Sequence, residues 1–215
     1  MKVGVIGSGQ VGQVLAKAFL SEGHQVMMGT RDTSKKEVVK WVKENPPGQA
    51  GSFSETAKFG ELLVLATMGS AAEETIRLAG PENFSKKTVI DTTNPVAPLP
   101  PTHGVLHYFT SLESSLMERI QSAVPEAKLV KAFNSVGNAF MYKPNFKEGK
   151  PTMFICGNDD AAKKTVSQVL TSFGWEPEDM GSVESARAIE PLCMLWCIPG
   201  LLRNQWTHAF KLLKG

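Results

Sequence analysis

The chain opens with the run Val3-Gly4-Val5-Ile6-Gly7-Ser8-Gly9-Gln10-Val11-Gly12, in which an apolar stretch leads into three glycines spaced as G-x-G-x-x-G. A stretch of helical composition follows, and a second apolar run ends in Gly29-Thr30-Arg31-Asp32. This order predicts a strand, a glycine turn, a helix and a second strand. It is the setting in which such glycines bind a dinucleotide.

Each glycine of the motif has a physical reason to be there. Gly7 permits the tight turn, Gly9 lets the backbone approach a pyrophosphate, and Gly12 lets the helix pack close to the sheet. The start of the helix offers unpaired N–H groups and a positive dipole end to the phosphates.

The end of the second strand predicts which dinucleotide binds. Domains that bind NAD place an acidic residue about 20 positions further on, where it holds a ribose hydroxyl. This chain instead has Thr30 and Arg31, and Lys35 adds positive charge nearby. Because a guanidinium group binds a 2′-phosphate that a carboxylate would repel, we expect NADP rather than NAD. Asp32 could still be the ribose-binding acid in a shifted register.

Composition limits the class of protein. The 215 residues suit one large domain or a main domain with a small appendage. A net charge of +2, with no basic run longer than a pair, predicts no nucleic-acid or membrane partner. Three cysteines are typical of a reduced protein, and no apolar run reaches the roughly 18 residues of a membrane span. We therefore expect a cytoplasmic protein.

Apolar runs that alternate with helical segments predict the rest of the fold. The expected further strands are residues 61–67, 88–91, 128–133, 152–156 and 175–180. This alternation predicts an α/β, Rossmann-type, doubly wound and mainly parallel sheet over residues 1–182. Residues 183–215 have a helical pattern with a break at 197–200, which predicts two helices that pack on the main domain or form a homodimer surface.

Ligands bind beyond the carboxyl ends of parallel strands, so the strand ends are the candidate site. Asn94 and Asn134 offer donors and acceptors to a nicotinamide carboxamide, although an asparagine before Pro95 is also a common turn former. These strand ends contain no catalytic lysine, no paired carboxylates and no histidine close in sequence, and the scattered histidines predict no metal site. Hydride transfer suits such a site, because it requires alignment of two rings and exclusion of water.

Several motifs together carry a family resemblance that spans nearly the whole chain. They are VGVIGSGQVGQVLA, GTRD, VIDTTNPV, KLVKAFNS, FICGNDDAAKK and DMGSVESARAIEPL. On these the chain resembles the NADPH-dependent reductases of the deazaflavin coenzyme F420, together with the related NADPH domain of membrane ferric reductases.

The resemblance implies a binding mode. It places Ser8, Gln10 and Val11 beside the pyrophosphate, Thr30 and Arg31 on the 2′-phosphate with Lys35 as a helper, Ala66, Thr67 and Met68 along the cofactor, and Asn94 and Ala132 near the nicotinamide. The second redox partner would stack on the nicotinamide beneath the C-terminal segment. The deazaflavin reductases carry a proline at Met68 and a histidine at Asn134, which leaves a flavin as an alternative acceptor.

The leading hypothesis is therefore an NADP-dependent oxidoreductase that passes hydride between NADPH and a small-molecule acceptor of deazaflavin or flavin type. A reductase of a small imine or carbonyl is an alternative. It needs a proton donor, for which Thr67, Ser135 and Tyr108 are the candidates. A non-enzymatic NADPH-sensing module, whose C-terminal helices contact a partner, is the third interpretation.

Overall fold

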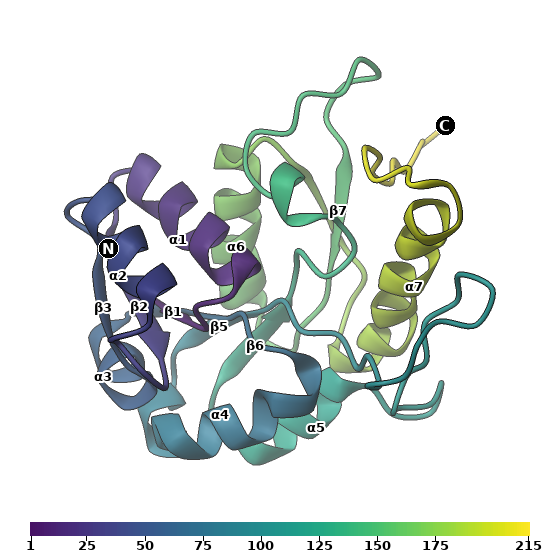
Figure 1. The fold of residues 1–215 in the computed structure, drawn as a ribbon. Coiled ribbons are helices and arrows are strands. Elements are labelled where there is room, and N and C mark those ends of the chain that lie inside the picture. The colour runs from purple at the N-terminus through teal and green to yellow at the C-terminus, as the bar shows by residue number, and fades with distance from the viewer.

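Six parallel strands form the central sheet of the computed structural model, which describes residues 1–215 (Figure 1). The strands are β1 (Lys2–Ile6), β2 (Gln25–Thr30), β3 (Gln49–Ser52), β4 (Leu62–Leu65), β5 (Thr88–Asp91) and β6 (Lys128–Lys131). Their spatial order is β3-β2-β1-β4-β5-β6, so the chain reverses direction across the sheet between β1 and β4. This is the strand order of a Rossmann fold, and it confirms the predicted doubly wound sheet.

Helices cover both faces of the sheet (Figure 1). On one face lie α1 (Gln10–Ser21), α2 (Lys36–Glu44) and α6 (Asp160–Ser172), and on the other lie α3 (Phe53–Phe59), α4 (Ala72–Ala79) and α5 (Leu116–Ala123). Successive strand side chains point to opposite faces. In β4, Leu62 and Val64 accordingly join the first core, and Leu63 and Leu65 join the second.

A separate pair of strands extends the fold beyond β6. β7 (Thr152–Ile155) and β8 (Glu176–Asp179) pair in parallel, and α6 connects them. A single antiparallel bridge between Lys131 and Cys156 joins β7 to the end of β6. The sheet is therefore mainly parallel, as predicted, with one antiparallel contact at this edge.

The C-terminal segment contains one long helix, α7 (Ala186–Arg203), so the break expected at residues 197–200 is wrong. The helix contains Pro191 and Pro199 and ends only at Asn204, which adopts a left-handed conformation with φ 54°. The N–H groups of residues 204 and 205 bond to the carbonyls of Gly200 and Pro199 there, as at a typical helix end.

No second helix follows α7, because the tail folds back along it. A Cβ atom on Gly200 would lie 2.2 Å from the ring of Trp206, so the glycine makes room for that indole. Trp196 stacks on His208 with ring centroids 5.0 Å apart, and Thr152 of β7 donates its N–H to the carbonyl of Phe210. The segment thus packs on the main domain, while a domain boundary after residue 182 and a homodimer surface stay predictions. None of the helices combines the length and apolar character needed to cross a membrane.

Candidate functional site

The glycine turn joins β1 to α1 at the carboxyl edge of the sheet. Gly7 has φ +131°, and a Cβ atom there would lie 2.2 Å from the carbonyl oxygen of Ala66. A Cβ atom on Gly12 would lie 2.0 Å from the carbonyl oxygen of Gly7. A Cβ atom on Gly9 would meet nothing within 4 Å. The fold therefore requires glycine at positions 7 and 12, whereas Gly9 faces open space.

The first turn of α1 leaves its positive end available. Gly9 is the N-cap residue and provides no side chain to accept from the first N–H groups, and no acidic residue lies in the first turn. By contrast, Ser52 and Ser115 cap α3 and α5 with their hydroxyl groups. Uncapped N–H groups at a helix start attract an anion, so this end of α1 is suited to a phosphate.

A cavity of about 560 Å³ extends from the glycine turn along the ends of β4 and β5. We call it the strand-end cavity, and residues 9–11, 66–70, 92–94 and 96–98 line it. Of the residues expected from the sequence, the lining includes Gly9, Gln10, Val11, Ala66, Thr67, Met68 and Asn94. The others, which do not line it, are Gly7, Ser8, Gly12, Thr30, Arg31, Lys35, Pro95, Ala132 and Asn134. None of the lining residues has an ionisable side chain.

The end of β2 presents a free guanidinium group. Arg31 is exposed and takes part in no ion pair, and Thr30 is buried, with its hydroxyl 3.2 Å from that of Ser8. The carboxylate of Asp32 accepts from the hydroxyl of Ser34 at 2.6 Å and from its N–H at 2.9 Å, and these bonds lower the pKa of Asp32. One carboxylate oxygen of Asp32, the alternative ribose-binding residue, is therefore engaged within its own turn, whereas the guanidinium group of Arg31 has no ion-pair partner.

The two strand-end asparagines contact each other. Asn94 donates from Nδ2 to the carbonyl of Asn134 at 2.7 Å, and Asn134 donates from Nδ2 to Oδ1 of Asn94 at 3.2 Å and to the carbonyl of Ile189 at 2.9 Å. The side chain of Asn94 thus makes a long-range bond rather than the local turn bond that Pro95 also allowed. Oδ1 of Asn134 and Oγ1 of Thr67 are buried without any hydrogen-bond partner. Such atoms are costly to bury, and Thr67, unlike Asn134, lines the strand-end cavity.

The backbone is strained at Phe133, the residue before Asn134. Phe133 has φ +62°, a left-handed conformation that is uncommon for a bulky residue. Its N–H donates to Sδ of Met153 at 3.1 Å instead of continuing the strand ladder. The chain therefore turns sharply after β6, and residual strain of this kind is typical of functional positions.

A buried ion cluster lies behind the strand ends, outside the lining of the cavity, and the strand-end residues alone did not reveal it. Nζ of Lys131 lies 2.6 Å from Oδ2 of Asp91, 3.0 Å from Oε1 of Glu190 and 2.9 Å from the carbonyl of Thr93. All three charged side chains are buried. The sequence signal was a lysine within the strand KLVKAF, whose flanking residues are buried on both faces of the sheet.

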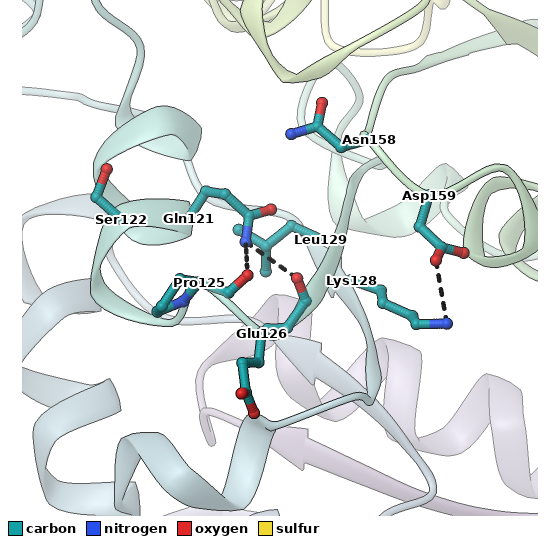
Figure 2. A pocket seen from close by; sticks show the side chains of 9 residues that line it. Gln121, Ser122, Pro125, Glu126, Lys128, Leu129, Asn158 and Asp159 are labelled. Carbon is teal, nitrogen blue, oxygen red and sulfur yellow. Dashed lines mark hydrogen bonds and ion pairs between the residues drawn. The ribbon is translucent and has the colours of Figure 1, made fainter.

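A second cavity, also of about 560 Å³, lies at the opposite, amino end of β6 (Figure 2). Lys128 and Asp159 form an ion pair there at 3.0 Å, and Nε2 of Gln121 donates to the carbonyls of Pro125 and Ala127. These polar groups bond to one another, and none of the buried polar atoms without a partner belongs to this cavity. The strand-end cavity is therefore the better candidate site.

Comparisons with known proteins found similar sequences and a similar fold. Residues 2–95 match the family model described as NADP oxidoreductase, coenzyme F420-dependent. The crystal structure of a putative F420-dependent NADP reductase from Arthrobacter sp. FB24 superposes with a TM-score of 0.93 at 31% identity, covering 100% of both chains. The F420-dependent NADP reductase of Methanocaldococcus jannaschii is 26% identical over 91% of this chain and 90% of its own length. The metalloreductase STEAP3 of Rattus norvegicus is 29% identical over 94% of this chain, which spans only 39% of that protein.

Proposed function

This chain belongs to the family of coenzyme F420-dependent NADP oxidoreductases, and we propose that it transfers hydride between NADPH and a deazaflavin or flavin ring. The observation that carries the proposal is the lining of the strand-end cavity, which contains small, apolar and neutral polar residues and no ionisable side chain. Hydride transfer between two cofactor rings requires no acid or base from the protein. It requires alignment of the two rings and exclusion of water.

The residues of the site fit NADPH at three points. The open end of α1, with Gly7, Ser8, Gly9, Gln10, Val11 and Gly12, would hold the pyrophosphate. Thr30, Arg31 and Lys35 would hold the 2′-phosphate. Thr67, Asn94 and Asn134 would hold the nicotinamide carboxamide, since two of them have buried oxygens without a partner. Ala66, Met68, Pro95 and Ala132 would complete the contacts. When bound, NADPH supplies the hydride, and these residues orient it.

The acceptor is the finer part of the proposal. Two relatives that match over most of their length are named as F420-dependent reductases, which favours a deazaflavin. Met68 at the mouth of the cavity is 73% exposed, so an apolar side chain is available to a flat ring placed there. A flavin has a ring of the same shape and is the alternative acceptor.

Reduction of an imine or carbonyl has less support. Tyr108, the strongest proton donor among the candidates, already donates its hydroxyl to the carbonyl of Glu190 at 2.8 Å. Burial also raises the pKa of Tyr108 far above its usual range. Its proton is therefore held rather than available for transfer to a substrate.

Stopped-flow mixing of the protein and NADPH with coenzyme F420, FMN or FAD tests the proposal. We expect one of these rings to be reduced as NADPH is oxidised. Replacing Arg31 by Ala should weaken NADPH binding by roughly 10- to 100-fold, the worth of a charged hydrogen bond, and leave NADH binding unchanged. Arg119→Ala, at an exposed arginine on α5, is the matched control. Tight NADPH binding without turnover of any acceptor would refute the enzyme and favour the sensing module.

A further inference from the structure

The buried ion cluster of Asp91, Lys131 and Glu190 contains two acidic side chains and only one basic side chain. Every contact of the two carboxylates is a donor. Asp91 accepts from the N–H and hydroxyl of Thr93 at 2.9 and 2.7 Å, and Glu190 accepts from the N–H groups of Leu116 and Met117, both at 2.9 Å. These N–H and hydroxyl groups, together with the ammonium group of Lys131, are the donors from which carboxylate oxygens accept.

Lys131 is charged as well. Burial by itself lowers the pKa of this ammonium group, but the adjacent charges of Asp91 and Glu190 and their hydrogen bonds together outweigh burial and raise it. Two carboxylates and one ammonium group give the cluster a net charge of about −1. The start of α5 contributes about half a positive charge through the two N–H groups that bond to Glu190, so the balance remains negative.

This charge lies directly behind the wall of the strand-end cavity. Thr93 lines the cavity and bonds to both Asp91 and Lys131, through its N–H, hydroxyl and carbonyl groups. On the other side, the carbonyl of Ile189, the neighbour of Glu190, accepts from Asn134. The three side chains of the cluster are buried, and they come from α7 and the ends of β5 and β6, elements that Figure 1 labels. Water therefore screens its field only weakly.

We propose that the buried ion cluster acts as a fixed negative charge that favours NADP⁺ over NADPH at the Asn94 end of the cavity. This inference rests on the proposed function. A hydride carries one proton and two electrons, and its departure to the acceptor leaves the nicotinamide ring with a positive charge. A preorganised negative charge stabilises that developing charge without reorganising, so the cluster promotes hydride donation. Its members touch neither ring and are positioning residues for this electrostatic effect.

The ratio of the affinities for NADP⁺ and NADPH tests the proposal, because a purely structural role changes both affinities together. We expect Glu190→Gln, which removes one negative charge, to lower the NADP⁺ preference about tenfold in calorimetric titrations with each nucleotide. A unit charge acting over about 10 Å at an effective dielectric constant of about 20 has an effect of this order. Glu74→Gln, at an exposed ion pair on α4, removes the same charge from the surface and should leave the ratio unchanged.

Two further variants keep the test valid if Glu190→Gln does not fold. The double variant Lys131→Met with Glu190→Gln retains the net charge of Asp91 alone and should keep the original ratio. Adding Asp91→Asn removes that charge and should lower the ratio about tenfold. An unchanged ratio on adding Asp91→Asn, or in a folded Glu190→Gln variant, overturns the inference. If the unaltered protein bound neither nucleotide, the proposed function itself would fail, and that result is distinguishable.

Discussion

Replacing Lys131 by Met removes the only positive side chain from the buried ion cluster. Methionine has a similar length and fills the same space, so the main change is in charge. Asp91 and Glu190 would remain buried, each held by its hydrogen bonds but without a counter-ion. Removing one partner from a buried charge pair costs about 3–5 kcal/mol. Against a typical free energy of unfolding of about 5–15 kcal/mol, this loss is large.

The cost should depend on pH in a defined direction. In the folded variant, uptake of one proton by Asp91 or Glu190 would remove one uncompensated charge. In the unfolded chain both carboxyl groups are exposed to water and bind almost no protons above about pH 5. The folded variant then binds more protons than the unfolded chain, so its free energy of unfolding falls as pH rises, by at most about 1.4 kcal/mol per pH unit. The deficit relative to the unaltered protein should be larger at pH 8 than at pH 5.

Urea unfolding followed by tryptophan fluorescence at these two pH values measures the deficit. Lys128→Met is the matched control, because it makes the same replacement at the other end of β6, where the pair with Asp159 is about one-third exposed. We expect that control to lose no more than about 1 kcal/mol at either pH. A loss of under about 1 kcal/mol for Lys131→Met, or the same loss at both pH values, would refute the electrostatic account of the cluster.

Two other predictions concern the glycine turn and the contact between α5 and α7. Gly12→Ala should unfold the protein or lower its stability by several kcal/mol, because the new Cβ atom would meet the carbonyl of Gly7. Gly9→Ala should fold normally, yet weaken NADPH binding at least tenfold. Thermal melts measure the stability of both variants, and NADPH titrations measure their binding. A hydrogen bond from Arg187 holds the pKa of Glu118 at about 2, below its ordinary 4.5. The stability that this ion pair contributes is complete above the unfolded pKa of Glu118 and is lost as pH falls towards 2. Because solvent screens the half-exposed Arg187, we expect unfolding curves to show a loss of about 1 kcal/mol over this pH range. The variant Glu118→Gln should not show this loss.

The strands were largely predictable because they are buried on both faces. β4 is a continuous apolar run, and β1 and β5 are buried from their second residue onward, which is the pattern of parallel strands covered by helices. β3 has the sequence Gln-Ala-Gly-Ser and no apolar pattern, since it is an edge strand held mainly by backbone pairing with β2. The sequence therefore contained no signal for it.

The end of α7 was predicted wrongly for a local reason. Pro199 and Gly200 together are typical of a helix end, yet the helix continues to Arg203. Its termination depends on Trp206, which packs on Gly200, and on the tail that returns towards β7. These are tertiary contacts, and they override the local preference of a proline and a glycine.

The strand-end rule pointed to the edge of the sheet where the strand-end cavity lies, because it depends only on the direction of parallel strands, and seven of the expected residues line that cavity. It could not identify the ion cluster, since Glu190 comes from α7, an element without a strand end. Single-residue patterns also gave Lys131 no partner. Pairing of charges between elements distant in the chain is a property of the packed fold, and only the structure supplies it.

Stability alone gives a weak reason for such a cluster. Replacing a buried set of charges by apolar residues of similar volume is often neutral or stabilising, so a core built only for stability would do as well with methionine and leucine. What an apolar core cannot provide is a charge of fixed sign behind the cavity wall. The two N–H groups of α5 reduce the cost of Glu190 without cancelling its charge. An arrangement that leaves one negative charge beside a neutral cavity is costly for a scaffold, and it suits a site where a positive charge develops.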